Sequence, residues 1–169
     1  MRLRSLHITS LMQPAVAALH DAATRAEWSL LAPLLSAQHA QVRVAMLAQQ
    51  PVGHALVLLH PSDAWQVLWQ TTTGASLQQA QALAAWLRHA NSALLSDMYV
   101  APGYRRLGIG QALLDDAIEC ATRAARAVLA LQVAADNTAA QGLYARSGFV
   151  RSDNPVEDGL WFYLRRLSS

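Results

Sequence analysis

The sequence predicts a single α/β (α+β) domain in which helices flank a mixed β-sheet. Short apolar runs that are typical of strands alternate with stretches whose apolar residues recur at helical spacing. The 169 residues are enough for a substantial core, and 53% of them are hydrophobic while only 14% are charged. Because no internal repeat or low-complexity linker interrupts the chain, we expect residues 1–169 to form one domain.

The first sixty residues predict a strand, two helices and a β-hairpin. Residues 2–8 indicate the first strand, and residues 14–25 predict a helix because proline is favoured near a helix N-terminus. A second helix is expected at about residues 28–36. Two apolar runs, residues 42–48 and 52–60, flank a Gln-Gln-Pro segment and predict a hairpin.

About thirty residues separate this hairpin from the next predicted strand, and they indicate a helical insertion at about residues 75–90. Ser76 and Gln79 have the spacing of a capping box. One helical face would be apolar. Its residues are Leu77, Ala80, Leu83, Ala84 and Leu87. The insertion is interpreted first as a surface element or dimer contact, and alternatively as one wall of a substrate pocket.

The segment LLSDMYVAPGYRRLGIGQALL, residues 94–114, predicts an anion site. Residues 94–100 indicate a strand, and a helix is expected to begin within the motif Arg105-x-x-Gly108-x-Gly110. Apolar residues then recur at helical spacing, namely Leu114, Ile118, Ala121 and Ala125. The first amides of a helix have no intrahelical partner and lie at the positive end of its dipole, so they bind phosphate oxygens. The two glycines allow close approach to the backbone, and Arg105 and Arg106 add positive charge.

Two common phosphate-binding motifs do not fit this loop. A P-loop requires Lys and Ser/Thr after the second glycine, where this chain has Ile109 and Gly110. A dinucleotide fingerprint requires a third glycine where this chain has Leu113.

A second block predicts another strand and helix. Residues 128–133 are an apolar run suited to a buried parallel strand, and Asp136-Asn137 supplies N-cap chemistry for a helix at 138–146. Ser147-Gly148 provides its end. Residues 160–167 indicate a closing strand.

Both blocks resemble the signatures of the GNAT superfamily of N-acetyltransferases over roughly residues 94–150. The loop resembles the family's coenzyme A pyrophosphate loop, Arg/Gln-x-x-Gly-x-Gly/Ala. The segment from Asn137 to Phe149 resembles its second signature, Asn-x-x-Ala-x-x-Leu-Tyr-x-x-x-Gly-Phe. The resemblance implies a mostly antiparallel mixed sheet that is splayed where acetyl-CoA binds as cosubstrate. The insertion at 75–90 departs from the short connection that the family has there.

The resemblance also implies a set of coenzyme A contacts. Backbone groups of Met98, Tyr99 and Val100 would bind the pantetheine arm like an added strand. Pyrophosphate would meet the amides of a six-residue segment beside Arg105. That segment comprises Arg106, Leu107, Gly108, Ile109, Gly110 and Gln111. Members often have glycine at the position of Arg106 and a basic or polar residue at that of Leu107, so we expect weaker electrostatic help here. Asn137 has two compatible interpretations, a helix N-cap and a pantetheine contact.

Acetyl transfer to an amine needs a neutral nucleophile, a stabilised oxyanion and a proton for the leaving thiolate. Tyr144 matches the family's general acid, with a buried core tyrosine as the alternative. Amides near Tyr99 and Val100 would stabilise the oxyanion. Several members place Glu where this chain has Ser96, so Asp97 is the candidate base acting through water. Asp97 could instead bind a cationic acceptor or pair with an arginine.

Three other predictions concern side chains outside these motifs. His54 and His60 alternate on the third strand and could face the cleft, but scattered histidines without metal spacing are more often structural, so no metal site is predicted. The single cysteine, Cys120, is interpreted as inert packing. The apolar segment Trp161-Phe162-Tyr163, together with the insertion, favours a homodimer.

We therefore expect an acetyl-CoA-dependent N-acetyltransferase that acts on a small primary amine by direct attack in a ternary complex. The alternatives are an acetyltransferase of peptide or protein N-termini and a non-catalytic acyl-CoA-binding module. A net charge of +2 is too small for a nucleic-acid-binding protein. No apolar run reaches the ~20 residues that cross a bilayer, and no signal peptide is evident, so no membrane association and a cytoplasmic location are expected.

Overall fold

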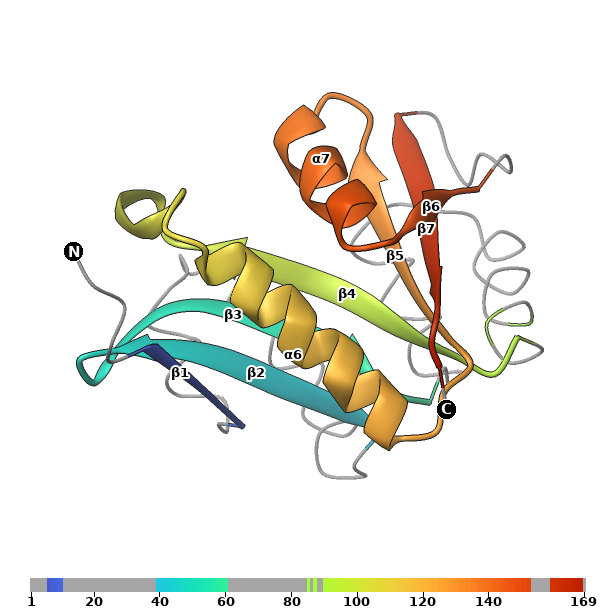
Figure 1. The fold of residues 1–169 in the computed structure, drawn as a ribbon, viewed down its shortest axis with the longest axis horizontal. Helices are drawn as coiled ribbons and strands as arrows, with labels where there is room; N and C mark the ends of the chain where they lie inside the picture. The colour runs from blue at the N-terminus through green and yellow to red at the C-terminus, as the bar shows by residue number, and fades with distance from the viewer. Residues whose placement is uncertain are drawn as a thin grey trace.

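The computed structural model describes residues 6–10, 39–60, 85, 87, 90–152 and 159–168. In this part of the chain seven strands form one sheet, ordered β1-β2-β3-β4-β5-β7-β6, and two α-helices lie against it (Figure 1). The strands are β1 (Leu6–Ser10), β2 (Ala40–Leu47), β3 (Gln50–Leu58), β4 (Ser92–Val100), β5 (Val128–Ala134), β6 (Val150–Arg151) and β7 (Leu160–Arg166). The helices are the 3₁₀ turn η1 (Pro102–Tyr104), α6 (Ile109–Arg123) and α7 (Thr138–Arg146).

The predicted mixed, mostly antiparallel sheet is confirmed. Every neighbouring pair of strands is antiparallel except β4 and β5, which run parallel. Parallel neighbours need a crossover connection, and α6 supplies it between these two strands. The chain therefore forms a β4-α6-β5 unit at the centre of an otherwise antiparallel sheet.

The hairpin of β2 and β3 is tighter than the sequence indicated. Ala48 and Gln49 form the turn with positive φ angles of 48° and 66°, so Gln50 and Pro51 already belong to β3. Two such residues match the right-handed twist of the flanking strands. Pro51 is tolerated because it lies next to the strand end, beside a bulge in the pairing with β2.

Other boundaries differ by a few residues, and two short elements were not predicted. The first strand in the described part is β1, Leu6–Ser10, which ends two residues later than expected, and residues 2–5 lie outside the described residues. Helix α6 ends at Arg123, and Ala125 lies beyond it with a φ of 54°. The sequence analysis missed η1 and the two-residue β6, because neither is long enough to show a period. His60 lies after the end of β3 and so does not alternate with His54 on that strand.

Several predicted helices fall on residues outside the described part. These are the helices at 14–25 and 28–36 and most of the insertion at 75–90. Within the insertion, Ala85 and Leu87 are helical and Leu87 is completely buried.

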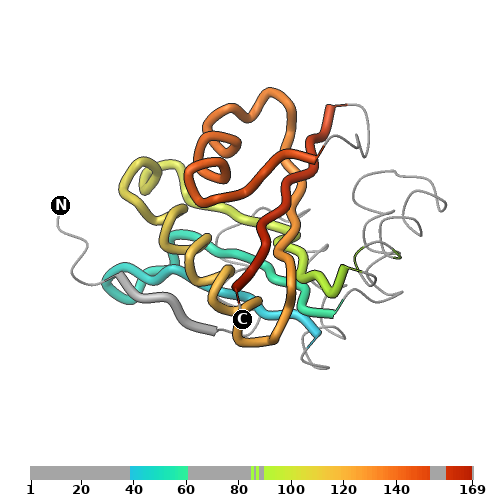
Figure 2. Tube along the Cα trace, turned by 45° about the vertical axis from the view of Figure 1, so that its right-hand side comes forward, coloured from blue at the N-terminus to red at the C-terminus, as the bar shows by residue number. Residues whose placement is uncertain are grey.

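Helix α6 covers one face of β2, β3 and β4 (Figure 2). The main hydrophobic core lies beneath this helix and extends to β5, α7 and β7. The buried residues of the helix lie along one stripe, as its 3.6-residue period requires. They are Ile109, Leu113, Leu114, Ala117, Cys120 and Ala121. This packing fixes the N-terminal turn of α6 at the end of β4.

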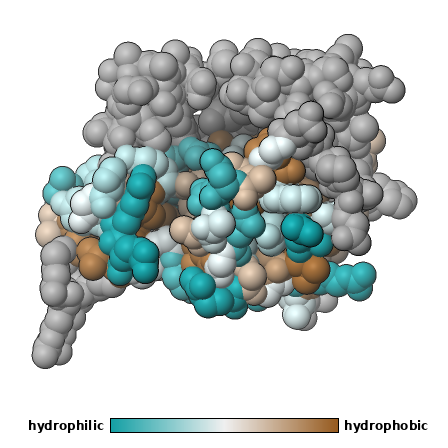
Figure 3. All heavy atoms as spheres, turned by 90° about the horizontal axis from the view of Figure 1, so that it is seen from above, coloured by the Kyte–Doolittle hydropathy of each residue, from teal (hydrophilic) through white to brown (hydrophobic). Residues whose placement is uncertain are grey.

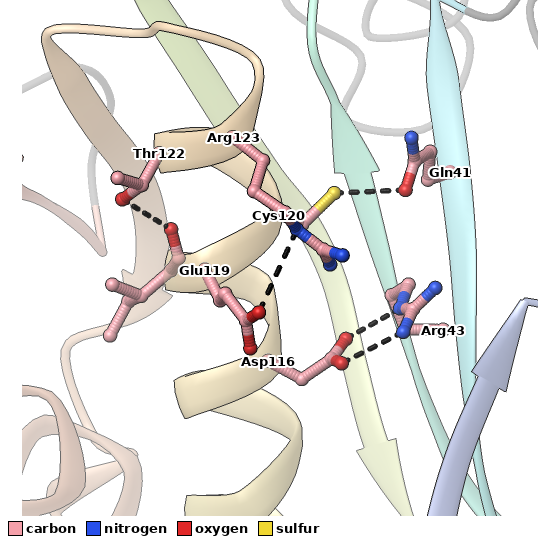
Figure 4. A network of polar contacts seen from close by, with 8 residues as sticks. Gln41, Arg43, Asp116, Glu119, Cys120, Thr122 and Arg123 are labelled. Atoms are coloured by element: carbon pink, nitrogen blue, oxygen red, sulfur yellow. Dashed lines mark hydrogen bonds and ion pairs between the residues drawn. The ribbon is translucent and has the colours of Figure 1, made fainter. Parts of the chain in front are cut away.

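Polar contacts also connect α6 to β2 (Figure 4). Arg43 donates from Nε and Nη2 to the two carboxylate oxygens of Asp116, at 2.5 and 2.8 Å. The Asp116 hydrogen bond raises the pKa of Arg43. Cys120 donates to the side-chain oxygen of Gln41 at 3.0 Å, and burial raises the pKa of its thiol. An un-ionised, buried thiol is a poor nucleophile, which supports the packing interpretation of Cys120.

Asp116→Ala is expected to lower the free energy of unfolding by about 1–3 kcal/mol, because it leaves the guanidinium of Arg43 partly buried and unpaired. Glu119→Ala is the matched control on the same helix, because its side chain is 66% exposed and lies 3.8 Å from Arg123. An exposed pair of this kind contributes at most about 0.5 kcal/mol. Urea denaturation measures both changes, and equal effects would contradict the prediction.

Candidate functional site

The sheet opens between β4 and β5, and this opening is the centre of the candidate site. The parallel pairing joins residues 92–95 to residues 128–131 and then stops, although β4 continues to Val100 and β5 to Ala134. Figure 1 shows the two strands diverging beyond this point. In the described part of the chain, residues 96–100 therefore have a strand partner only on the β3 side.

A β-bulge at Ser96 marks the start of the opening. Leu56 of β3 pairs with Asp97, whereas the next residue, Val57, pairs with Leu95, so Ser96 is the extra residue. One extra residue shifts the side-chain alternation of a strand by one position. Leu95 faces the core beneath α6, and without the bulge Asp97 would face the same way. The bulge instead directs Asp97 to the opposite face of the sheet.

On that face Asp97 contacts His54. The two residues are diagonal neighbours across β3 and β4, and His54 Nε2 lies 2.7 Å from Asp97 Oδ2. The histidine side chain is fully buried while that of Asp97 is 42% exposed. Tyr99 lies directly opposite His54 with the rings stacked at 5.8 Å. Asp97 therefore has a histidine partner rather than the arginine considered from the sequence.

The loop after β4 leads to an open helix N-terminus. Gly108 is the N-cap of α6 with a φ of 82°, in the left-handed region that favours glycine. The first intrahelical hydrogen bond runs from Ala112 N–H to Gly108 C=O. The amides of Ile109, Gly110 and Gln111 precede it and so have no acceptor within the helix. The first turn contains no acidic residue, which leaves the helix dipole unopposed for an anion.

Arg106 has a backbone conformation that glycine favours. Its φ is 63°, a conformation that glycine adopts freely and an arginine adopts at a cost of about 1–2 kcal/mol. The glycine that the resembled pattern often has at this position therefore fits the backbone. Arg106 is exposed, whereas Leu107 packs against the core.

Two other predicted side chains have partners within the protein. Arg105 donates from Nε to the carbonyl oxygen of Val100 at 2.9 Å, which connects the loop to the end of β4. Gln111 donates from Nε2 to Asp115 and to the hydroxyl of Ser147, at 2.9 and 3.0 Å. The Ser147 contact connects the first turn of α6 to the end of α7.

Asn137 caps α7, as one of its two interpretations required. Its Oδ1 accepts a hydrogen bond from the amide of Ala140 at 3.1 Å. Asn137 lies seven residues before Tyr144, about 10 Å along the helix, so these two side chains are not brought together.

Tyr144 lies on α7 with its side chain buried. Its ring packs against Phe149 and Tyr163 at centroid distances of 5.9 and 6.3 Å. Burial raises the pKa of Tyr144 to about 12, and the negative charge of Asp97 contributes to the increase. The two predicted catalytic residues are thus close enough to interact electrostatically. Tyr144 keeps its proton at neutral pH and can donate it.

Sequence reasoning missed the close approach of Gly53 to β4. A Cβ added to Gly53 would lie 2.7 Å from the carbonyl oxygen of Tyr99 and 3.2 Å from Leu113 Cδ1. Only glycine allows β3 and β4 to pack this closely beneath α6. An isolated glycine within a strand pattern was the available signal.

Two searches of the described residues gave negative results. No group of three or more His, Cys, Asp or Glu side chains there could hold a metal ion. None of the helices in the same part of the chain has the length and apolar composition needed to span a bilayer.

Comparisons with known proteins agree with this geometry. The family model described as "Acetyltransferase (GNAT) family" matches residues 8–149. No curated protein sequence matches the chain.

Several solved structures share the fold. The ribosomal-protein-S18-alanine N-acetyltransferase from Escherichia coli aligns with a TM-score of 0.64 and 20% identity, covering 97% of this chain and 95% of that one. The paia N-acetyltransferase from Thermoplasma acidophilum, in complex with coenzyme A, aligns with a TM-score of 0.63 and 14% identity, covering 96% of this chain and 99% of that one. The yncA protein from Salmonella typhimurium, with its cofactor acetyl-CoA, aligns with a TM-score of 0.64 and 18% identity, covering 98% of this chain and 96% of that one. At these identities the likeness shows the fold alone.

Proposed function

The chain belongs to the GNAT acetyltransferase family, and from this premise we propose that it transfers an acetyl group from acetyl-CoA to the primary amine of a small molecule. The observation that carries the proposal is the opening between β4 and β5, which leads to the unpaired amides of α6. An extended ligand with an anionic group at one end fits such a site. Acetyl-CoA has this form, with an amide-bearing pantetheine arm joined to a pyrophosphate.

The pantetheine arm would lie along residues 96–100 and hydrogen-bond to the backbone of Met98, Tyr99 and Val100 as an added strand does. The pyrophosphate would then meet the amides from Arg106 to Gln111. The N-terminus of α6 lies next to the end of β4, which supports this arrangement. A Cβ on Gly110 would lie 3.9 Å from Val100 Cγ2 and 3.6 Å from Leu143 Cδ2 of α7. The acetyl group would lie towards Asp97 and Tyr144.

In the proposed reaction, Asp97 acts on the attacking amine and Tyr144 acts on the leaving thiolate. The amine nitrogen attacks the thioester carbonyl, so the C–N bond forms and the C–S bond breaks. Before the attack, the ammonium form of the acceptor releases one proton to solvent. During the attack, Asp97 takes the second proton through a water, and the Tyr144 hydroxyl donates to the departing sulfur. Proton exchange with solvent then restores both residues. Backbone amides near Tyr99 and Val100 stabilise the oxyanion that forms during the attack.

The acceptor class follows from the charge of Asp97. A primary amine is mainly an ammonium ion at neutral pH, and the partly exposed Asp97 carboxylate offers it an opposite charge. A cationic acceptor therefore suits the site.

A thiol-release assay over a panel of amines tests the proposal. The panel should include polyamines, amino acid derivatives, amino sugars and a peptide with a free N-terminus. Turnover of a small amine supports the proposed function, whereas turnover of the peptide alone supports an N-terminal acetyltransferase. Calorimetric binding of acetyl-CoA without turnover of any amine would support the non-catalytic module instead.

Gly108→Asp should weaken acetyl-CoA binding at least tenfold, which corresponds to about 1.4 kcal/mol. The new carboxylate would lie at the helix end that is proposed to receive the pyrophosphate. Gly108→Asn is the matched control, since Asn and Asp have the same shape and both tolerate positive φ, so the difference between them isolates the charge. Calorimetric titration giving equal affinities for the two folded variants would remove the pyrophosphate from this loop.

The homodimer and the cytoplasmic location remain predictions. The aromatic segment gives the homodimer less support than expected, because Phe162 and Tyr163 are buried and Arg151 covers the ring of Trp161 at 4.1 Å. Viewed from above, the described residues expose intermixed hydrophilic and hydrophobic areas (Figure 3). The prediction now depends on the insertion at 75–90, and light scattering at micromolar concentration tests it.

A further inference from the structure

We infer that His54 is a positioning residue, which fixes the carboxylate of Asp97 toward the acceptor side of the proposed site. The inference rests on the proposed function and adds to it a residue that does not touch either substrate. It begins from the difference in exposure between the two partners. His54 is fully buried, whereas the Asp97 side chain is 42% exposed, so only Asp97 can meet an acceptor.

The hydrogen bond between the two residues has a defined direction. An ionised carboxylate only accepts hydrogen bonds, so His54 Nε2 carries the proton and donates it to Asp97 Oδ2. The 2.7 Å contact occupies one carboxylate oxygen and leaves Oδ1 for a water or an amine. A carboxylate held at one oxygen cannot rotate freely about its terminal torsion, which is otherwise broad.

The surrounding fold holds the imidazole itself in place. His54 lies within β3, between strands β2 and β4, and its ring stacks on that of Tyr99. The bulge at Ser96 is what brings Asp97 onto this face of the sheet. The buried donor His54 and the carboxylate of Asp97 thus meet where the pairing between β4 and β5 ends.

This arrangement bears on the missing glutamate of the family pattern. Ser96, at the glutamate position, is the bulged residue and is exposed. Asp97 has a shorter side chain than glutamate and starts from a different position on the strand. A fixed orientation compensates for the reduced reach, because small errors in the position of a reacting group cost up to about 100-fold in rate.

Three variants test the role of His54. His54→Leu removes the hydrogen bond while keeping an apolar side chain in the core, and His54→Gln keeps an N–H donor near the position of Nε2. With an accepted amine, His54→Leu should lower kcat at least tenfold without changing the KM for acetyl-CoA. His54→Gln should recover most of that loss. In an Asp97→Asn background, His54→Leu should cause less than a twofold further loss, since its effect acts through Asp97.

The possible outcomes separate this inference from the proposed function. Thermal unfolding identifies the fraction of folded protein, to which each kcat is normalised. Unchanged kcat in His54→Leu, failure of His54→Gln to recover activity, or equal losses in both backgrounds would each overturn the positioning role while leaving the enzyme assignment in place. A folded wild-type protein that acetylates no amine in the panel would overturn the proposed function and this inference with it.

Discussion

Tyr144→Phe should reduce turnover about 100-fold or more while acetyl-CoA affinity stays unchanged, because phenylalanine keeps the buried ring and removes its only acidic proton. The raised pKa of Tyr144, about 12, makes its phenol a weaker acid than an ordinary thiol, whose pKa is about 8.5. Much of its effect is therefore expected to come from hydrogen bonding to the developing thiolate. Steady-state kinetics and calorimetric titration on the same preparation separate turnover from binding.

The pH dependence provides an independent check. A residue with a pKa of about 12 keeps its proton throughout the usual assay range, so Tyr144 should produce no alkaline decline in rate below about pH 11. Tyr144→Phe should thus lower the whole profile without changing its shape. Tyr163→Phe is the matched control, because it removes a hydroxyl from the neighbouring buried ring. Full wild-type turnover in Tyr144→Phe would exclude Tyr144 as the acid.

Asp97→Asn should lower kcat by about 100-fold or more, within the range typical of a lost general base. The amide has the shape of the carboxylate and can still accept the hydrogen bond of His54, so the local packing should persist. The change removes one negative charge and the ability to take a proton. Kinetic measurements at saturating acetyl-CoA, with the amine varied, distinguish the two effects.

The alternative role of Asp97 predicts a different pattern. If the carboxylate only binds a cationic acceptor, Asp97→Asn should raise the KM for the amine and leave kcat intact. Glu119→Gln provides the control, since it makes the same charge change on an exposed side chain of α6. Similar losses in both variants would indicate a general charge effect and contradict the base assignment.

The sequence was most informative where local chemistry determines structure. The cap of Asn137 and the glycine at the start of α6 act within a few residues, and each was predicted close to its observed position. The turn at Ala48 and Gln49 was missed because neither residue type favours a positive φ. Its conformation depends on the register of the two strands that it joins.

The candidate site shows where sequence reasoning ends. The backbone segments of the loop could be placed from spacing alone, whereas the contact between His54 and Asp97 joins residues 43 positions apart. That contact depends on the bulge at Ser96, and one extra residue in a strand has no periodic signal. The close approach of Gly53 to Tyr99 likewise depends on how two strands and a helix pack.

The opening between β4 and β5 leaves an edge in the middle of the sheet. Most proteins keep such edges short, charged or covered, because unpaired backbone groups recruit other extended chains. In the described part of the chain, residues 96–100 have no strand partner on this side, and closing the edge with another strand would remove the proposed site. A molecule that lies along residues 96–100 completes the sheet. Binding of such a molecule would therefore also shield this edge from other extended chains.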